Sequence, residues 1–380
     1  MIPYGRQSID DSDVEAVVAA LRSDWLTQGP KVAEFEAALA AYCGARYAVA
    51  VCNGTAALQA AYFAADLKTG DEFVTTPLTF AATATAGLWQ GAKPVFADVD
   101  PATGNLDPKA AAAAVTSKTK AVVPVDYSGR PVDLDAFRRL AKEKGLLLIE
   151  DACHALGADD RGRRIGSVAD MTVFSFHPVK SITTGEGGAI LTNDAALRDK
   201  MLEFRTHGIR RGEDWQYDVA TQGLNYRLTD LQAVLGISQL KRLDSFVARR
   251  RDIARRYDAA FAKWPEVEPQ PGQVEESAWH LYPLRLRGAL AAKRREVFQA
   301  LRRGGIGVQV HYIPVYWHPL YRNLGYARGL CPNAEALYER LISLPMYPDL
   351  TGAQQDEVVR TLRGVLDEVG AGLRAGESRG

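Results

Sequence analysis

Short apolar runs alternate with helix-like stretches through the first 150 residues, and this alternation constrains the fold more than any other feature. Near-continuous apolar strands that alternate with helices are typical of a mostly parallel sheet whose two faces are both covered by helices. We therefore predict an α/β fold, in which ligands bind beyond the carboxyl ends of the strands. The predicted strands are YAVAV (47–51), EFVTTP (72–77), KPVFADV (93–99), KAVVPVDY (120–127) and GLLLIEDA (145–152).

Helix signals fill the intervals between these runs. A first helix is expected over 10–22, where Asp10 or Ser12 can cap the chain and Val14, Val17 and Val18 share one face. The other predicted helices cover about 31–42, 55–65, 80–90, 108–115 and 134–144.

The pattern changes after about residue 236, which predicts a second, smaller domain. We expect a large domain over 1–236, including the N-terminal segment, and a C-terminal α+β domain over 237–380. In the second domain the sequence predicts one Arg-rich helix over 237–264, a loop over 268–279, strands at 280–286 and 308–315, and helices over about 291–304 and 353–373.

Composition limits the partners that the chain is expected to bind. Lys plus Arg and Asp plus Glu are equal at 46 each, so nothing indicates nucleic acid or an anionic membrane as a partner. The four cysteines form no CxxC pair and no two histidines have helical i, i+4 spacing, so we predict no metal site. The N-terminus carries no basic and then apolar leader, which predicts a cytoplasmic protein.

Three polar stretches follow apolar runs and are candidates for chemistry. Asp151 directly follows a strand, although an isolated Asp there is equally a helix cap. Lys180 stands between the apolar run 170–176 and a Thr- and Gly-rich run, where it could also be an ordinary solvated lysine. Asn53-Gly54 precedes a helix that begins near Thr55; this is a plain turn or a cradle for phosphate at a helix N-terminus.

Taken together, the three stretches fit pyridoxal 5'-phosphate (PLP). A lysine forms a Schiff base with the cofactor aldehyde, a carboxylate pairs with the pyridinium nitrogen, and a helix N-terminus holds the phosphate. One further βα-type unit lies between Asp151 and Lys180, so both can reach one pocket at the edge of the sheet.

The same stretches carry a family resemblance. The segments CNGTAALQ (52–59), TPLTFAATA (76–84), EDACHALGA (150–158), FSFHPVKSITTGEGGAILTN (174–193) and GLNYRLTDLQAVLG (223–236) closely resemble the DegT/DnrJ/EryC1/StrS sugar aminotransferases. The resemblance extends over nearly the whole chain. It implies the PLP-dependent transferase fold type I and a homodimer with two shared active sites.

Residue roles follow from the resemblance position by position. It implies that Lys180 is the Schiff-base lysine and that Asp151 pairs with the pyridinium. The remaining cofactor contacts that it implies are Thr55, Ala56 and Ser175 at the phosphate, Phe80 on the ring, His154 near the ring, and Asn225 from the other subunit. The substrate contacts that it implies are Tyr4, Asp24, Trp25, Leu26, Thr27, Thr55, Ser175, Asn225, His311, Tyr312, Ile313 and Pro314. For His154, a pocket histidine without a role in proton transfer is as compatible with the sequence as a proton-handling one.

Within the family, the chain looks most like members that move an amino group from glutamate to C4 of a UDP-linked 4-keto-6-deoxy-N-acetylhexosamine in pseudaminic acid synthesis. The alternative in the same reaction class is a dTDP-linked or D-configured UDP sugar. Two other functions stay open: a related sugar 3-dehydratase, against which Lys180 argues because those relatives have histidine there, and a non-catalytic member of the fold.

Overall fold

The computed structural model describes residues 1–271 and 274–377, and its centre is a seven-stranded sheet. The strand order is β1-β9-β8-β5-β4-β2-β3, and every strand runs in the same direction except β9, which is antiparallel to both of its neighbours. The predicted α/β fold with a mostly parallel sheet is confirmed. The strands are β1 (Tyr47–Val51), β2 (Glu72–Thr75), β3 (Lys93–Phe96), β4 (Thr119–Val123), β5 (Leu147–Asp151), β8 (Met171–Ser175) and β9 (Gly188–Thr192).

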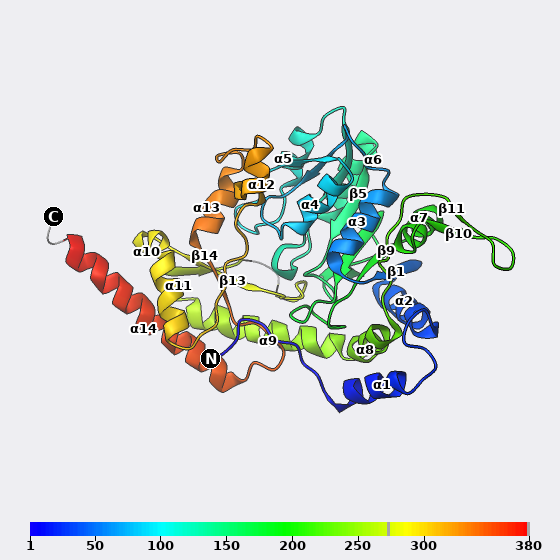
Figure 1. Ribbon diagram of the computed structural model, residues 1–380. Helices are drawn as coiled ribbons and strands as arrows, with labels where there is room; N and C mark the ends of the chain where they lie inside the picture. The colour runs from blue at the N-terminus through cyan, green and yellow to red at the C-terminus, as the bar shows by residue number, and fades with distance from the viewer. Residues whose placement is uncertain (272–273, 378–380) are drawn as a thin grey trace.

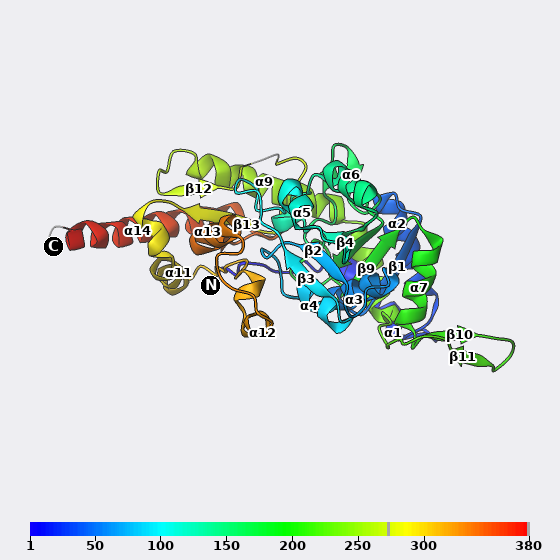
Figure 2. The ribbon, with the colours of Figure 1, turned by 90° about the horizontal axis from the view of Figure 1, so that it is seen from above.

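Helices cover both faces of this sheet (Figure 1 and Figure 2). Alternate residues of one strand enter different cores: Val49 and Val51 pack on the side of α3 and α7, whereas Ala48 and Ala50 pack on the side of α2 and α6. Burial on both faces explains why the strands are apolar throughout. The helices are α2 (Pro30–Cys43), α3 (Gly54–Ala64), α4 (Ala82–Trp89), α5 (Pro108–Ala114), α6 (Leu134–Lys144) and α7 (Ala195–Arg205).

Every strand and helix predicted before residue 152 is present, with ends that differ by a few residues. The first helix, α1 (Asp11–Leu21), begins after Asp10, whose side chain accepts a hydrogen bond from the amide of Asp13. Asp10, rather than Ser12, is therefore the cap. Two short elements lie between the predicted ones: the 3-10 turn η1 (Tyr127–Gly129) and the hairpin of β6 (Asp159–Asp160) and β7 (Arg163–Arg164).

The single helix predicted over 237–264 is wrong, because the chain forms two helices, α8 (Asp230–Leu240) and α9 (Leu243–Phe261). The break falls at Lys241 and Arg242. The guanidinium of Arg242 forms ion pairs with Asp10 and Asp13 of the first helix, a long-range contact that the apolar pattern does not reveal.

The C-terminal region is built on a small antiparallel sheet of β12 (Val267–Pro269), β13 (Tyr282–Leu286) and β14 (Leu341–Leu344). The strand predicted over 308–315 is wrong: Gln309 makes one isolated bridge to Ser343, and the chain then turns toward a cavity. The predicted loop over 268–279 begins inside β12, and its residues 272–273 lie outside the described residues. The helices here are α10 (Ala289–Ala292), α11 (Arg294–Arg303), α12 (Pro319–Asn323), α13 (Pro332–Arg340) and α14 (Gly352–Glu377), with a 3-10 turn, η2 (Val315–Trp317).

Two segments join the core of the C-terminal region to the rest of the chain. Helix α9 packs Phe246 and Val247 in the core under the large sheet and Ile253 and Tyr257 in the C-terminal core. The N-terminal Ile2 also lies in the C-terminal core. The division into 1–236 and 237–380 stays a prediction.

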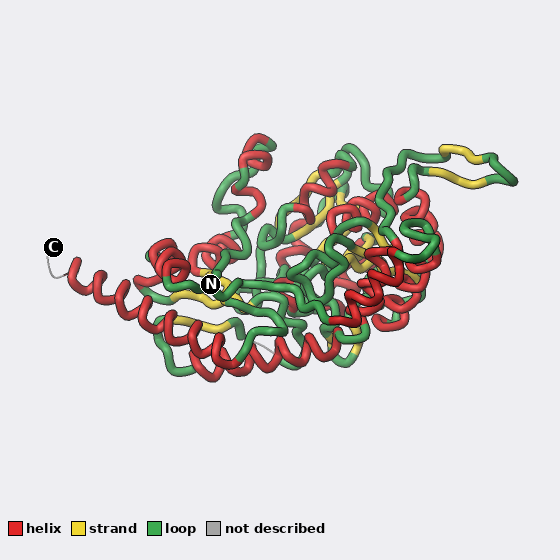
Figure 3. Tube along the Cα trace, turned by 60° about the horizontal axis from the view of Figure 1, so that its bottom comes forward, coloured by secondary structure: helices red, strands yellow, loops and turns green. Residues whose placement is uncertain are grey.

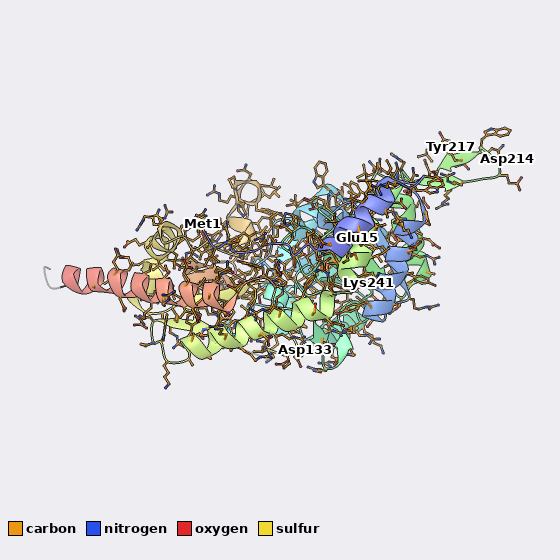
Figure 4. The ribbon with its side chains drawn as sticks, turned by 90° about the horizontal axis from the view of Figure 1, so that it is seen from below. Met1, Glu15, Asp133, Asp214, Tyr217 and Lys241 are labelled. Carbon is orange, nitrogen blue, oxygen red and sulfur yellow. The ribbon has the colours of Figure 1, made fainter. Side chains whose placement is uncertain are left out.

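One hairpin projects from the body. Strands β10 (Ile209–Arg211) and β11 (Tyr217–Val219) form an antiparallel pair that extends away from the helices (Figure 1 and Figure 3). Asp214 and Tyr217 lie on this projecting part (Figure 4). No helix among the described residues has both the length and the apolarity that crossing a membrane requires.

Candidate active site

A cavity of about 1060 Å³ lies at the carboxyl edge of the large sheet. Parallel strands deliver their carboxyl ends to the same edge, so residues that follow β1, β2, β5 and β8 meet there. Of the predicted site residues, the cavity brings together Thr55, Ala56, Phe80, Asp151, His154, Ser175, Lys180, Tyr4, His311 and Tyr312.

Asp151 is the last residue of β5 and is buried at the base of this cavity. Its Oδ2 accepts a hydrogen bond of 2.7 Å from the hydroxyl of Thr83, and its Oδ1 accepts one of 3.2 Å from the amide of Cys153. The residues after Asp151 form a turn, so the alternative interpretation as a helix cap is wrong. Thr83 was missed by the sequence analysis, because a threonine inside a helix carries no signal for a contact 68 residues away.

Lys180 lies in the turn that follows β8. Its amide donates to the carbonyl of His177, and its own carbonyl accepts from the buried guanidinium of Arg250. Burial lowers the pKa of the Lys180 amine, and the nearby Cys153 and Asp151 oppose that shift. The neutral form of the Lys180 amine is therefore more favoured here than it is for a lysine in water.

The start of α3 lies against the end of β8 and forms a tight cradle. A Cβ at Gly54 would lie 2.9 Å from Cβ of Ser175, and one at Gly188 would lie 2.6 Å from the carbonyl oxygen of Asn53. Only glycine allows this approach. Asn53 caps the helix by accepting from the amide of Ala56 at 2.8 Å, so the Ala56 amide is already bonded and Thr55 is the exposed residue of the turn.

Aromatic side chains form part of the cavity wall. Phe80 is 62% exposed, and its ring centroid lies 6.4 Å from that of Tyr312. The hydroxyl of Tyr312 lies 3.0 Å from Nε2 of His154, while the buried Nδ1 of His154 has no hydrogen-bond partner. Burial, and then the charge of Lys180, lower the pKa of His154 well below its ordinary value, so this ring is neutral.

His280 also lines the cavity and was not predicted. Its ring centroid lies 4.3 Å from that of His154, and burial again lowers its pKa well below the ordinary value. His311 faces the same space, with Nδ1 2.8 Å from the hydroxyl of Ser343, and burial lowers its pKa to about 4. All three imidazoles are therefore uncharged at neutral pH.

Several predicted substrate residues lie outside this cavity. The segment from Asp24 to Thr27 is exposed; Leu26 accepts from the amide of Asp230, and Thr27 bridges to Thr229. Asn225 pairs with Thr206, and its neighbours Leu224 and Tyr226, rather than Asn225 itself, line the cavity. Ile313 and Pro314 follow the lining residue Tyr312 but do not line the cavity. The cavity of one chain therefore contains only part of the predicted site.

The polar groups that line the cavity fit PLP. A buried carboxylate stands at one end, as a protonated pyridine nitrogen requires, and the hydroxyls of Thr55 and Ser175 stand beside a helix N-terminus, as a phosphate requires. The exposed ring of Phe80 supplies a flat apolar surface in the same cavity. A metal ion has no comparable place, since no group of three or more His, Cys, Asp and Glu among the described residues is arranged to hold one.

Comparison with known proteins defines the class. The family model for the DegT/DnrJ/EryC1/StrS aminotransferase family matches residues 7–363, so the chain belongs to this family. It is a PLP-dependent aminotransferase.

Individual relatives match over nearly their full length. The spore coat polysaccharide biosynthesis protein SpsC of Bacillus subtilis is 42% identical over 96% of this chain and 97% of its own. The UDP-4-amino-4,6-dideoxy-N-acetyl-beta-L-altrosamine transaminase of Campylobacter jejuni is 40% identical over 98% of this chain and 99% of its own.

Solved structures agree. PseC of Helicobacter pylori, an aminotransferase involved in pseudaminic acid biosynthesis, superposes with a TM-score of 0.93 at 34% identity, over 97% of this chain and 99% of its own. Spr1654 of Streptococcus pneumoniae in its PLP form superposes with a TM-score of 0.92 at 32% identity, over 97% of this chain and 99% of its own.

The contact between Thr83 and Asp151 generates a prediction. Replacing Thr83 with Val removes the hydroxyl that orients the carboxylate while keeping the side-chain volume, and we expect the Kd for PLP to rise about tenfold, the scale of one hydrogen bond to a charged group. Titration of the apoprotein with PLP, followed by absorbance, measures this change. Thr83→Ser is the matched control and should retain wild-type affinity; a Thr83→Val variant that binds PLP within about twofold of wild type would contradict the assigned contact.

Proposed function

We propose that this aminotransferase transfers an amino group from glutamate to C4 of a UDP-linked 4-keto-6-deoxy-N-acetylhexosamine. The observation that carries the chemistry is the placement of the Lys180 amine and the Asp151 carboxylate in one cavity at the carboxyl edge of the sheet. The sugar is inferred from the relatives whose names specify it, which are 37% to 40% identical to this chain.

Lys180 and Asp151 have different roles in the proposed reaction. PLP, when bound, supplies an electron sink and the carbon that carries the amino group between the two substrates. Asp151, held by Thr83, keeps a proton on the pyridine nitrogen. Lys180 holds the cofactor and then moves a proton as a neutral amine, and its lowered pKa suits that task.

The remaining lining residues have binding roles in this proposal. Thr55 and Ser175 bind the phosphate, Phe80 covers one face of the ring, and His154, whose Nδ1 lacks a partner, stands near the ring as a neutral hydrogen-bonding group. Tyr4, His311 and Tyr312 form the wall that meets the sugar. Neutral imidazoles and phenols suit hydroxyl and acetamido groups, which are uncharged hydrogen-bonding partners.

A homodimer accounts for the predicted residues that one chain leaves outside its cavity. Asn225 and the segment from Asp24 to Thr27 are proposed to complete the cavity of a second copy. The projecting hairpin supports this arrangement, because Trp215 is 83% exposed and Val219 is 69% exposed, and a two-stranded hairpin is marginally stable in water on its own. The cytoplasmic location expected from the sequence stays a prediction.

One alternative substrate class has specific support. SpsC matches this chain at 42% identity, and its name specifies spore coat polysaccharide rather than pseudaminic acid. A dTDP-linked or D-configured UDP 4-keto-6-deoxy sugar would use the same reacting groups, and the wall of Tyr4, His311 and Tyr312 would distinguish the sugar part.

A substrate panel distinguishes these candidates. The enzyme is loaded with pyridoxamine phosphate, and each keto sugar is added in a separate single-turnover experiment. We expect the absorbance of the pyridoxal form to return with the UDP-linked β-L-arabino 4-keto sugar at least about tenfold faster than with the others, since a few pocket contacts set such ratios. Faster conversion of a dTDP sugar would overturn the proposed substrate, and no return with any keto sugar would overturn amino transfer to sugars.

Mixing two inactive variants tests the shared site. In a heterodimer of Lys180→Ala with Asn225→Ala, one cavity carries both substitutions and the other carries neither. We therefore expect random mixing to restore up to about a quarter of wild-type activity, whereas each variant alone stays well below that value. An Asn225→Ala homodimer that loses activity but is not rescued by mixing, or a fully active monomer, would contradict sharing.

A further inference from the structure

Two carboxyl groups lie buried beside the active-site strand, in a place that the proposed chemistry does not use. Glu150 is the residue before Asp151 in β5, and Asp126 follows β4 in the sequence; both are 0% exposed. One oxygen of each has an ordinary donor. The hydroxyl of Thr172 donates to Glu150 Oε2 at 2.8 Å, and the amide of Val132 donates to Asp126 Oδ1 at 2.9 Å.

The other two oxygens, Glu150 Oε1 and Asp126 Oδ2, have no donor on any other residue that the structure describes. Val125 bridges Asp151 in the parallel direction, so Asp126 and Glu150 come from adjacent positions of two neighbouring chain segments. While both carboxyl groups are ionised, neither can donate to the other, because an ionised carboxylate only accepts. A proton on one of the two groups would supply the missing donor.

Neither carboxyl group forms an ion pair with a Lys, Arg or His side chain within residues 1–271 and 274–377. The titratable groups with which the pair interacts electrostatically include two acids and two thiols: Asp151, Asp160, Cys43 and Cys153. Burial raises the pKa of Asp126 well above its ordinary value and raises that of Glu150 as well. Two like charges at one buried site are costly, so one proton stays bound when free carboxyl groups are ionised.

The pair lies beside the backbone hydrogen bonds that join the segment after β4 to the end of β5. The amide of Asp126 donates to the carbonyl of Asp151 at 3.1 Å, and the amide of Asp151 donates to the carbonyl of Pro124 at 2.9 Å. Through Val132, the Asp126 side chain also closes the loop that begins with η1. Two carbonyl groups of that loop accept hydrogen bonds from the segment around Trp279 and His280. The amide of Ala278 donates to Gly129, and the amide of Leu281 donates to Ser128.

We propose that Asp126 and Glu150 share a single proton at neutral pH, and that this proton fixes the loop after β4 against β5 where Asp151 enters the cavity. Both are positioning residues, since neither lines the cavity. The positioning role rests on the proposed function of Asp151, whereas the shared proton does not. The folded protein holds a proton that the unfolded chain releases. The contribution of this pair to the free energy of unfolding is therefore greatest below the ordinary carboxyl pKa and falls as the pH rises.

Amide variants test the proton directly. Glu150→Gln and Asp126→Asn each replace the proton donor with an amide N–H and leave one negative charge, the same charge that the wild-type pair has at neutral pH. Between about pH 6 and about pH 9, we expect the Tm of the wild-type holoenzyme to fall relative to both variants by roughly 2 °C per pH unit. Glu143→Gln, on the exposed face of α6, is the matched control and should follow the wild type. Parallel Tm curves for wild type, Glu150→Gln and Asp126→Asn would overturn the shared proton.

A second measurement needs no variant that could fail to fold. The infrared spectrum of the wild-type holoenzyme in D₂O at neutral pH should contain the C=O stretch of a protonated carboxyl group, which disappears at alkaline pH. A spectrum without this band at neutral pH would overturn the proposal.

The positioning role has its own readout. We expect the Kd for PLP to rise with pH about tenfold more in the wild type than in Glu150→Gln. If the two affinities change in parallel while the Tm curves diverge, the shared proton stands and the positioning role is overturned. If Asp151→Asn also binds PLP with unchanged affinity, the proposed function of Asp151 is the part that fails.

Discussion

The parallel pairing of β5 with β8 is the constraint on which the rest of the site depends. It brings the carboxyl end of β5, with Asp151, and the turn after β8, with Lys180, to one edge of the sheet. Strand β9 runs antiparallel beside β8, so Gly188 at its start returns the chain to this same edge, against Asn53. Acid, amine and helix N-terminus therefore meet without any of them being neighbours in the sequence.

Burial at this edge adjusts the chemistry of each group. The same desolvation that lowers the pKa of Lys180 keeps His154, His280 and His311 neutral. The cavity therefore presents the buried carboxylate of Asp151, an amine of reduced basicity and a wall of uncharged rings, and Glu186 also lines it. In the proposed function, this wall would bind a polar sugar through hydrogen bonds, which are directional and costly to leave unmade and can therefore distinguish closely related sugars.

The sequence predicted the fold class, and it singled out residues after strand ends that the structure places in one cavity, because apolar runs and the polar residues directly after them are local signals. It failed where long-range contacts decide the outcome. The predicted helix is interrupted at Arg242, which forms ion pairs with Asp10 and Asp13, and Thr83 contacts Asp151 from a helix 68 residues earlier in the chain. The proton between Asp126 and Glu150 is a further contact of this kind, since neither carboxyl group carries a sequence signal for the other.

The central claim is that Lys180 holds the cofactor opposite Asp151, and peptide mapping tests it most directly. The PLP-loaded protein is reduced with borohydride, digested and analysed by mass spectrometry. The account predicts that the added mass of reduced PLP lies on Lys180 and is absent when Lys180→Ala is treated in the same way. Attachment to another lysine, or an unmodified Lys180 in the active holoenzyme, would contradict it.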